Sequence, residues 1–190
     1  MKYGTAPVQL ADGRYFVKVS GDDGSRVFIQ LNNTKLLSDL SEDEVTLHVD
    51  EKYHDKIREI DAQTVEAAKL NSAAWFGKEL PAKTLDAAAA KSLVDSSIDV
   101  GKITNKDRVV LVKVYDHTKT ETAEPVLADT VCDVLLECTG VWFLKKTYGP
   151  VWRITQVRLK SPPKKPKMLQ YMFQDDEADE ADEEEEEEYF

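Results

Sequence analysis

Residues 139–167 read TGVWFLKKTYGPVWRITQVRLKSPPKKPK and combine positive charge with aromatic side chains. The stretch has no acidic residue. Its cationic and aromatic residues are Lys145, Lys146, Arg153, Arg158, Lys160, Lys164, Lys165, Lys167, Trp142, Phe143, Tyr148 and Trp152. The sequence Tyr148-Gly149-Pro150 predicts a turn, and therefore a hairpin of two strands. Cations neutralise phosphates and flat rings stack on exposed bases, so this composition favours an unpaired nucleic acid strand as ligand.

The end of the chain has the opposite charge. Residues 175–188 contain 12 acidic residues, and two aromatic residues follow them. We expect this tail to compete with nucleic acid for the basic surface, with Asp175, Asp176, Glu177, Asp179, Glu180, Asp182, Glu183, Glu188, Tyr189 and Phe190 as its contacts. Two plainer interpretations stay open. The basic hairpin could be a solvated face, and the tail could serve only to keep the protein soluble.

The charge balance depends on the tail. The chain has 190 residues, enough for one ordinary domain, and a net charge of −11 from 25 basic and 36 acidic residues. Without the tail acids, 24 acidic residues remain against 25 basic ones, so the body of the protein is near neutral. A low overall isoelectric point is therefore no argument against nucleic acid binding, because the location of the charge decides it.

The sequence also predicts the cellular context. The first residues lack the apolar core of a secretory signal, and no stretch approaches the ~20 apolar residues of a membrane span. Cys132 and Cys138 are therefore expected to be reduced thiols of an intracellular protein, with a disulfide as the alternative.

Alternation and helical spacing predict a mainly β domain with a helical insertion. Apolar residues alternate over 14–20, 26–32, 44–49 and 108–115, and two longer strands are expected over 130–148 and 151–160. Helical spacing runs from about 50 to 76, with Gly77 as C-cap, and a second helix fits 84–94. We expect a five- to six-stranded antiparallel Greek-key barrel of the oligonucleotide-binding (OB) type over 1–160, with helices at about 51–97. A Pro/Lys linker (161–174) and a disordered acidic tail (175–190) follow.

Strand phase selects the candidate ligand contacts. Phe16, Lys18 and Phe28 are expected on the outer face of the first hairpin, although a helix could equally cover them. The predicted stacking residues are Trp142, Tyr148, Trp152, Phe16, Phe28 and Tyr115, and the predicted phosphate contacts are Lys18, Lys113, Lys145, Lys146, Arg153 and Arg158. The two hairpin tryptophans could instead belong to the core. We expect Trp75 and Phe76 to anchor the helix in the core.

The hairpin also resembles a known family. Its residues 140–144 (GVWFL), Lys145, Lys146, Tyr148-Gly149, Trp152 and Gln156-Val157 resemble the closing hairpin of the single-stranded-DNA-binding proteins of large nucleocytoplasmic DNA viruses. That family includes proteins of algal viruses and is similar to the replication single-strand-binding protein of short-tailed coliphages. Asn71-Ser72 with Trp75-Phe76-Gly77-Lys78, and the acidic tail with an aromatic end, are further points of likeness.

The resemblance implies a function as well as a fold. It implies an OB-type barrel that binds single-stranded DNA without strong sequence preference during viral DNA replication and recombination. It implies a tail that occupies the DNA groove and recruits replication partners such as a DNA polymerase or a helicase-primase. The location implied is the site of viral DNA replication in the host, the nucleus or a virus factory. A homodimer stays open.

Other functions have less support in the sequence. His48, His54 and His117 with the two cysteines match no metal-binding spacing, and no phosphate-binding glycine loop or nucleophile motif occurs, so neither a metal, a cofactor nor an enzyme is expected. An acidic histone or protein chaperone, with a β domain and a polyacidic tail, is the alternative, although such a protein does not need the cationic aromatic hairpin. An accessory protein that binds duplex DNA is a third.

Overall fold

The structure, a computed structural model, describes residues 1–10, 13–95, 99–102 and 111–160. The predicted linker and tail lie outside these residues, as do residues 108–110 of the predicted fourth strand. The elements in chain order are β1 (Lys2–Tyr3), β2 (Val8–Gln9), β3 (Tyr15–Ser20), β4 (Val27–Lys35), β5 (Glu44–Thr46), the 3₁₀ helix η1 (Glu51–Tyr53), α1 (His54–Leu70), α2 (Ser72–Phe76), α3 (Ala82–Ala88), β6 (Asp99–Lys102), β7 (Lys113–Tyr115), β8 (Val131–Leu144) and β9 (Thr147–Leu159).

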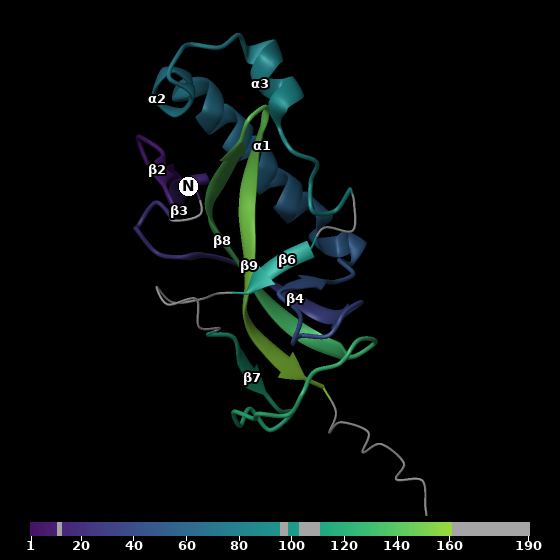
Figure 1. The fold of residues 1–190 in the computed structure, drawn as a ribbon. Coiled ribbons are helices and arrows are strands. Elements are labelled where there is room, and N and C mark those ends of the chain that lie inside the picture. Colours follow the sequence, from purple (N-terminus) through teal and green to yellow (C-terminus); the bar gives the residue numbers. More distant parts are fainter. Residues whose placement is uncertain (11–12, 96–98, 103–110, 161–190) are drawn as a thin grey trace, which may run out of the picture.

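A long antiparallel hairpin of β8 and β9 organises the sheet. Its ladder runs from the Cys132–Leu159 pair to the Leu144–Thr147 pair, with two irregularities in register. The free edge of β8 pairs with β3 and then β4, both antiparallel, while β9 pairs with β6 and β7, both parallel. Figure 1 shows this hairpin running the length of the molecule, with the helices around one end and β7 at the other. Every larger strand therefore takes its register from β8 or β9, except β5, which pairs with β6.

The hairpin turn lies elsewhere than the sequence predicted. Lys145 and Lys146 form a two-residue turn, and Tyr148-Gly149-Pro150 continues inside β9. The Gly-Pro dipeptide was misleading because Pro150 can be accommodated in a strand where its missing N–H is not needed. The two lysines therefore lie at the exposed tip of the hairpin, and Tyr148 lies within β9, where its side chain is buried and it pairs with Phe143.

The fold class was predicted correctly at the coarse level only. The domain is mainly β with a helical segment between β5 and β6, as expected. The described strands, however, form a mixed nine-stranded sheet and not a closed antiparallel barrel. Contact between β4 and β5 is limited to the neighbourhood of an isolated Leu36–Leu47 bridge. The short strands β1, β2 and β6 were not predicted, since two to four residues are too few to show a period.

The helices cover one face of the sheet, called here the inner face. Helix α1 buries Ile57, Ile60, Thr64, Ala67 and Ala68, which its helical spacing predicts. The same spacing also offers Leu70 or Asn71, and Leu70 is 86% exposed. Gly77 ends α2 with a positive φ of 71°, as a C-cap glycine should.

Aromatic contacts join the helices to the turn end of the hairpin. The Trp75 and Phe76 rings each lie within about 6 Å of Phe143, and Phe76 also contacts Tyr148. The Trp75 indole N–H donates to the Gly4 carbonyl at 3.1 Å. The expected core anchor at the end of the helix is confirmed.

The two cysteines of the chain form no disulfide bond. Cys132 and Cys138 are free and buried, and burial raises the pKa of each thiol to about 12. Within the described ranges, no helix combines the length and the apolar character needed to cross a bilayer.

The burial of Tyr148 leads to a stability prediction. Its ring is fully buried and its hydroxyl donates to the Leu85 carbonyl at 3.1 Å. Tyr148→Phe removes this one hydrogen bond and should lower the free energy of unfolding by about 1 kcal/mol, measured by urea denaturation. Lys145→Ala at the exposed tip is the control and should stay within about 0.5 kcal/mol of wild type. A Tyr148→Phe variant as stable as wild type would contradict this packing.

Candidate functional site

The face of the sheet opposite the helices collects most of the predicted ligand contacts. Residues that pair across adjacent strands project to the same side. The pairs are Phe16–Trp142 and Lys18–Gly140 between β3 and β8, Phe28–Glu137 between β4 and β8, Glu137–Arg153 and Asp133–Arg158 between β8 and β9, and Tyr115–Arg158 between β7 and β9. This surface, the outer face, therefore holds Phe16, Lys18, Phe28, Lys113, Tyr115, Trp142, Arg153 and Arg158.

Two rings on the outer face lie beside glycines. A Cβ atom at Gly140 would come within 2.2 Å of the Phe16 ring, whereas one at Gly149 would come within 2.8 Å of the Ala90 Cβ atom and at an ordinary contact distance of 3.4 Å from the Trp142 ring. The absence of a side chain at Gly140 therefore gives the Phe16 ring its place, while Gly149 makes room for Ala90. Both rings are half-buried, so one side of each is held by the sheet.

These rings line a pocket of about 290 Å³, called here the aromatic pocket. Its lining residues are Leu10, Arg14, Tyr15, Phe16, Thr139, Trp142, Val151 and Arg153. Flat rings and guanidinium groups thus come together from β3, β8 and β9 in one open concavity. Stacking and charge, the two requirements for binding an unpaired nucleotide, meet there.

Positive charge is concentrated beside the aromatic pocket. Arg153 is half-buried, and burial first, then the neighbouring Arg14, lowers the pKa of its guanidinium, while Glu137 acts in the opposite direction. Glu137 is 6% exposed and accepts a 2.7 Å hydrogen bond from Nε of Arg26. The Arg26 guanidinium also lies 5.0 Å from the centroid of the Phe28 ring. An anion placed here would be attracted to several guanidinium groups at once.

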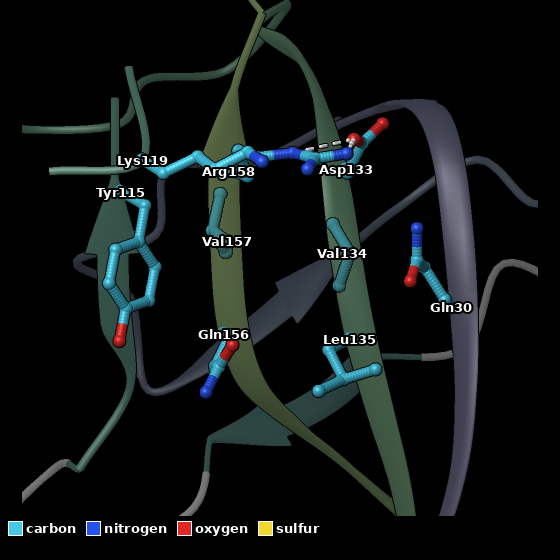
Figure 2. Close-up of a pocket in the computed structure, with 9 residues that line it drawn as sticks. All are labelled: Gln30, Tyr115, Lys119, Asp133, Val134, Leu135, Gln156, Val157 and Arg158. Carbon is cyan, nitrogen blue, oxygen red and sulfur yellow. Dashed lines mark hydrogen bonds and ion pairs between the residues drawn. The ribbon is translucent and has the colours of Figure 1, made fainter. Parts of the chain in front are cut away.

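A second concavity, called here the amide pocket, lies towards the other end of the hairpin. Its volume is about 260 Å³, and Figure 2 shows its lining residues: Gln30, Tyr115, Lys119, Asp133, Val134, Leu135, Gln156, Val157 and Arg158. The Arg158 side chain reaches across from β9 to Asp133 on β8, with Nε at 3.0 Å from the carboxylate. Arg158 is therefore an ion-pair partner within the protein and not only a surface cation.

Asp133 is the buried centre of this ion cluster. Its side chain is 5% exposed, and it binds Arg158, Lys160 at 2.7 Å and the Asn33 N–H at 3.1 Å. Burial would raise the pKa of the Asp133 carboxyl, but the hydrogen bonds from Lys160, Arg158 and Asn33 outweigh burial and hold that pKa below its ordinary value of 3.8. Two cations share one carboxylate, so the cluster has net positive charge.

Four predicted contacts lie elsewhere. Tyr148 and Trp152 are on the inner face and are 0% and 7% exposed, so neither ring is open to a base. The prediction that these two rings stack on a ligand is therefore wrong. Side chains alternate between the two faces along β9, and the neighbours Gly149 and Arg153 project to the outer face, so Tyr148 and Trp152 project to the inner face. Lys145 and Lys146 are exposed at the turn, beyond the outer face.

The remaining predicted cations differ in their surroundings. Lys18 is exposed on β3, whereas Lys113 is ion-paired with Glu121 at 2.8 Å. The acidic tail residues lie outside the described residues.

Sequence reasoning missed Arg14, Arg26 and Tyr15 as site residues, although the alternation of the first strands had placed both arginines outward. It also missed Glu137 and Asp133, because an acid inside a strand gives no sign of burial beside arginine.

A family model matches residues 32–175, which include both strands of the central hairpin. The chain belongs to this family, DUF5871, a family of unknown function. The match contains Trp142, Arg153 and most of the amide pocket, while Phe16, Lys18 and Phe28 precede it. No curated protein and no solved structure matches the chain.

In the described part of the chain, His, Cys, Asp and Glu residues form no group of three or more able to hold a metal ion.

The Asp133 cluster gives a prediction about pH. The folded pKa of Asp133 lies below 3.8, so its ionised form stabilises the protein above about pH 4, and this stabilisation is lost as pH falls through the folded pKa. Asp133→Asn should lower the free energy of unfolding by about 1–2 kcal/mol at pH 7, a discounted value because both cations are more than one-third exposed.

The measurement is urea denaturation of both proteins at pH 7 and at about pH 3. The difference between wild type and Asp133→Asn should shrink at the lower pH. Asp129→Asn, at an exposed ion pair with Lys35, is the control and should show little difference at either pH. A gap between wild type and Asp133→Asn that widens on acidification would contradict the assignment.

Proposed function

We propose that this protein binds single-stranded DNA on its outer face, with at most a modest base preference. One observation supports this most strongly: Phe16, which is seated over Gly140, and Trp142 line one open pocket together with Arg14 and Arg153. A base would stack on a ring and its phosphate would meet a guanidinium. Stacking on an aromatic side chain contributes about 1–3 kcal/mol per base and accepts any base.

The arrangement suits binding in two further respects. Each ring is held on one side by the sheet, so little side-chain entropy is lost when a base covers the other side. Guanidinium groups form two parallel hydrogen bonds to phosphate, which gives direction as well as charge.

The outer face is also long enough for a strand of several nucleotides. From Asp133 to Trp142, β8 spans ten residues, so nine steps of about 3.3 Å give a length of roughly 30 Å. The aromatic pocket lies at one end of this path and the amide pocket at the other, with Phe28 and Arg26 between them. A site of several nucleotides is the usual size for a domain of this kind.

The resemblance of the hairpin to the viral single-stranded-DNA-binding family supports this proposal. An element order in which strands β1–β5 precede the helical segment and a long β8–β9 hairpin ends the described sheet is compatible with a partly open arrangement of the OB type. In this proposal the protein protects single-stranded DNA during viral replication and recombination at the site of replication in the host cell. The acidic tail competes with DNA for the outer face and recruits replication proteins.

The first test uses tryptophan fluorescence. Of the three tryptophans, Trp75 and Trp152 are 5% and 7% exposed, and Trp142 is half-buried on the outer face. Oligo(dT) should quench part of the emission, and Trp142→Phe should remove that quenching. Affinity should fall steeply with salt, by roughly 0.7 in log K per log unit of salt for each phosphate contact.

Arg153→Gln gives the matching charge test. It should weaken binding about three- to tenfold and lower the salt slope by about 0.7. Lys83→Gln, exposed on α3 at the helical side, removes the same charge and should leave both values unchanged. If the protein binds core histones and oligo(dT) does not quench its fluorescence, the acidic chaperone function is favoured instead. Tighter binding of duplex than of single-stranded oligonucleotides would replace it with a duplex-binding role.

The second test removes the tail. A protein that ends at residue 174 lacks 12 carboxylates, which in this proposal compete for the outer face at high effective concentration because they belong to the same chain. Its dissociation constant for oligo(dT) should fall, with the larger change at low salt, and it should lose binding to replication proteins. Unchanged or weaker DNA binding by the shortened protein would exclude competition by the tail.

A further inference from the structure

A buried acid holds an arginine midway along the outer face. Glu137 is 6% exposed and lies between Asp133 and Trp142 along β8, and therefore between the two pockets. Both of its carboxylate oxygens accept hydrogen bonds from Arg26, one from Nε at 2.7 Å and the other from Nη2. A single guanidinium thus binds the acid through two parallel hydrogen bonds.

The Arg26 side chain is also held from a second direction. Its guanidinium carbon lies 5.0 Å from the centroid of the Phe28 ring. Phe28 pairs with Glu137 across the β4–β8 ladder, so the ring and the acid are neighbours on the same face. A long side chain loses rotamer freedom when it binds a ligand, and these two contacts remove much of that freedom beforehand.

These contacts leave one edge of the guanidinium available. A guanidinium has five N–H donors in a rigid planar fork, and Glu137 uses two of them on the edge formed by Nε and Nη2. Arg26 makes no other hydrogen bond within the described part of the chain. The edge formed by Nη1 and Nη2 keeps two parallel N–H groups, on a side chain that is 57% exposed. Such an edge matches two oxygens of a phosphate in spacing and direction.

The local charge also favours an anion. Arg153 pairs with Glu137 across the β8–β9 ladder, so the guanidinium groups of Arg26 and Arg153 share the surroundings of one carboxylate. Positive charge therefore remains after the ion pair has formed. A phosphate at the free edge of Arg26 would contact the guanidinium directly and would lie farther from Glu137, so attraction exceeds repulsion.

We propose that Arg26 is a phosphate-binding residue at the centre of the outer face and that Glu137 is its positioning residue. Phe28 supports the guanidinium, and the part of the ring that the guanidinium covers is not open to a base. This inference rests on the proposed DNA-binding function. It gives a favourable role to an acid that, by its charge alone, would weaken DNA binding.

The first experiment measures the affinity of the full-length protein for labelled oligo(dT) by fluorescence anisotropy at low salt. Arg26→Lys keeps the charge but removes the paired hydrogen bonds, so it should weaken binding about three- to tenfold. Arg58→Lys is the matched control, because Arg58 on α1 is 55% exposed and pairs with Asp95 at 3.0 Å. This control should bind as tightly as wild type. Wild-type affinity of the Arg26→Lys variant would overturn the proposal.

Glu137→Gln tests the sign of the effect. By charge alone, removing an acid from a face that binds DNA should tighten binding. Loss of positioning should instead weaken binding about two- to tenfold, because the ligand must then order the Arg26 side chain itself. In an Arg26→Gln background no guanidinium is left to position, so adding Glu137→Gln should leave the affinity unchanged or raise it. Tighter binding by the single Glu137→Gln variant would overturn the positioning role.

Circular dichroism of each variant under the assay conditions separates lost binding from lost folding. If Glu137→Gln does not fold, the comparison of Arg26→Lys with Arg58→Lys decides, since both side chains are exposed. A folded wild-type protein that binds no oligo(dT) would overturn the proposed function itself. Wild-type binding that Arg26→Lys leaves unchanged would overturn this inference alone.

Discussion

The structure depends on the continuous ladder between β8 and β9. Two strands of 14 and 13 residues pair along nearly their full length, and β3, β4, β6 and β7 all add to their edges. A residue's position in this ladder decides whether its side chain meets the helices or the open face. The two irregularities in register, near Leu135 and near Cys138, shift the phase, so that Cys138 faces inward and Gly140 faces outward.

This alternation separates structural from candidate functional aromatic residues. Phe143, Tyr148 and Trp152 share the inner face with the helices, where burial raises the pKa of Tyr148 to about 12 and its hydroxyl has a fixed partner. Trp142 and Phe16 occupy the outer face, where both rings line the aromatic pocket. Neighbouring residues in one short stretch of sequence therefore have opposite roles. A substitution scan that ignores the ladder would mix losses of stability with losses of binding.

Much of the fold could be predicted from the sequence. Strand phase over 14–20, 26–32 and 44–49 selected buried residues such as Val17, Leu31 and Val45, and helical spacing selected the buried side of α1. Parallel pairing of β6 and β7 with β9 could not be predicted, since it depends on contacts between segments far apart in the chain. The hairpin turn was misplaced because Gly149 and Pro150 are usual turn residues, and only the opposite strand shows that Lys145 and Lys146 form the turn.

The candidate site was predicted in the same uneven way. Eight of twelve residues lie on one face because strand phase is a local property, while the roles of Tyr148 and Trp152 depended on the turn position. The amide pocket was not predicted at all, since Gln30 and Gln156 become neighbours of Leu135 only in the folded sheet. Buried Asp133 and Glu137 were missed for the same reason.

Photo-cross-linking of oligo(dT) to the full-length protein, followed by mass spectrometric mapping of the modified peptides, tests the central claim most directly. The account predicts cross-links on the peptides that contain Phe16, Trp142 and Tyr115, which belong to three different strands of one face. Cross-links confined to peptides from α1–α3, or their absence from all three of these strands, would contradict it.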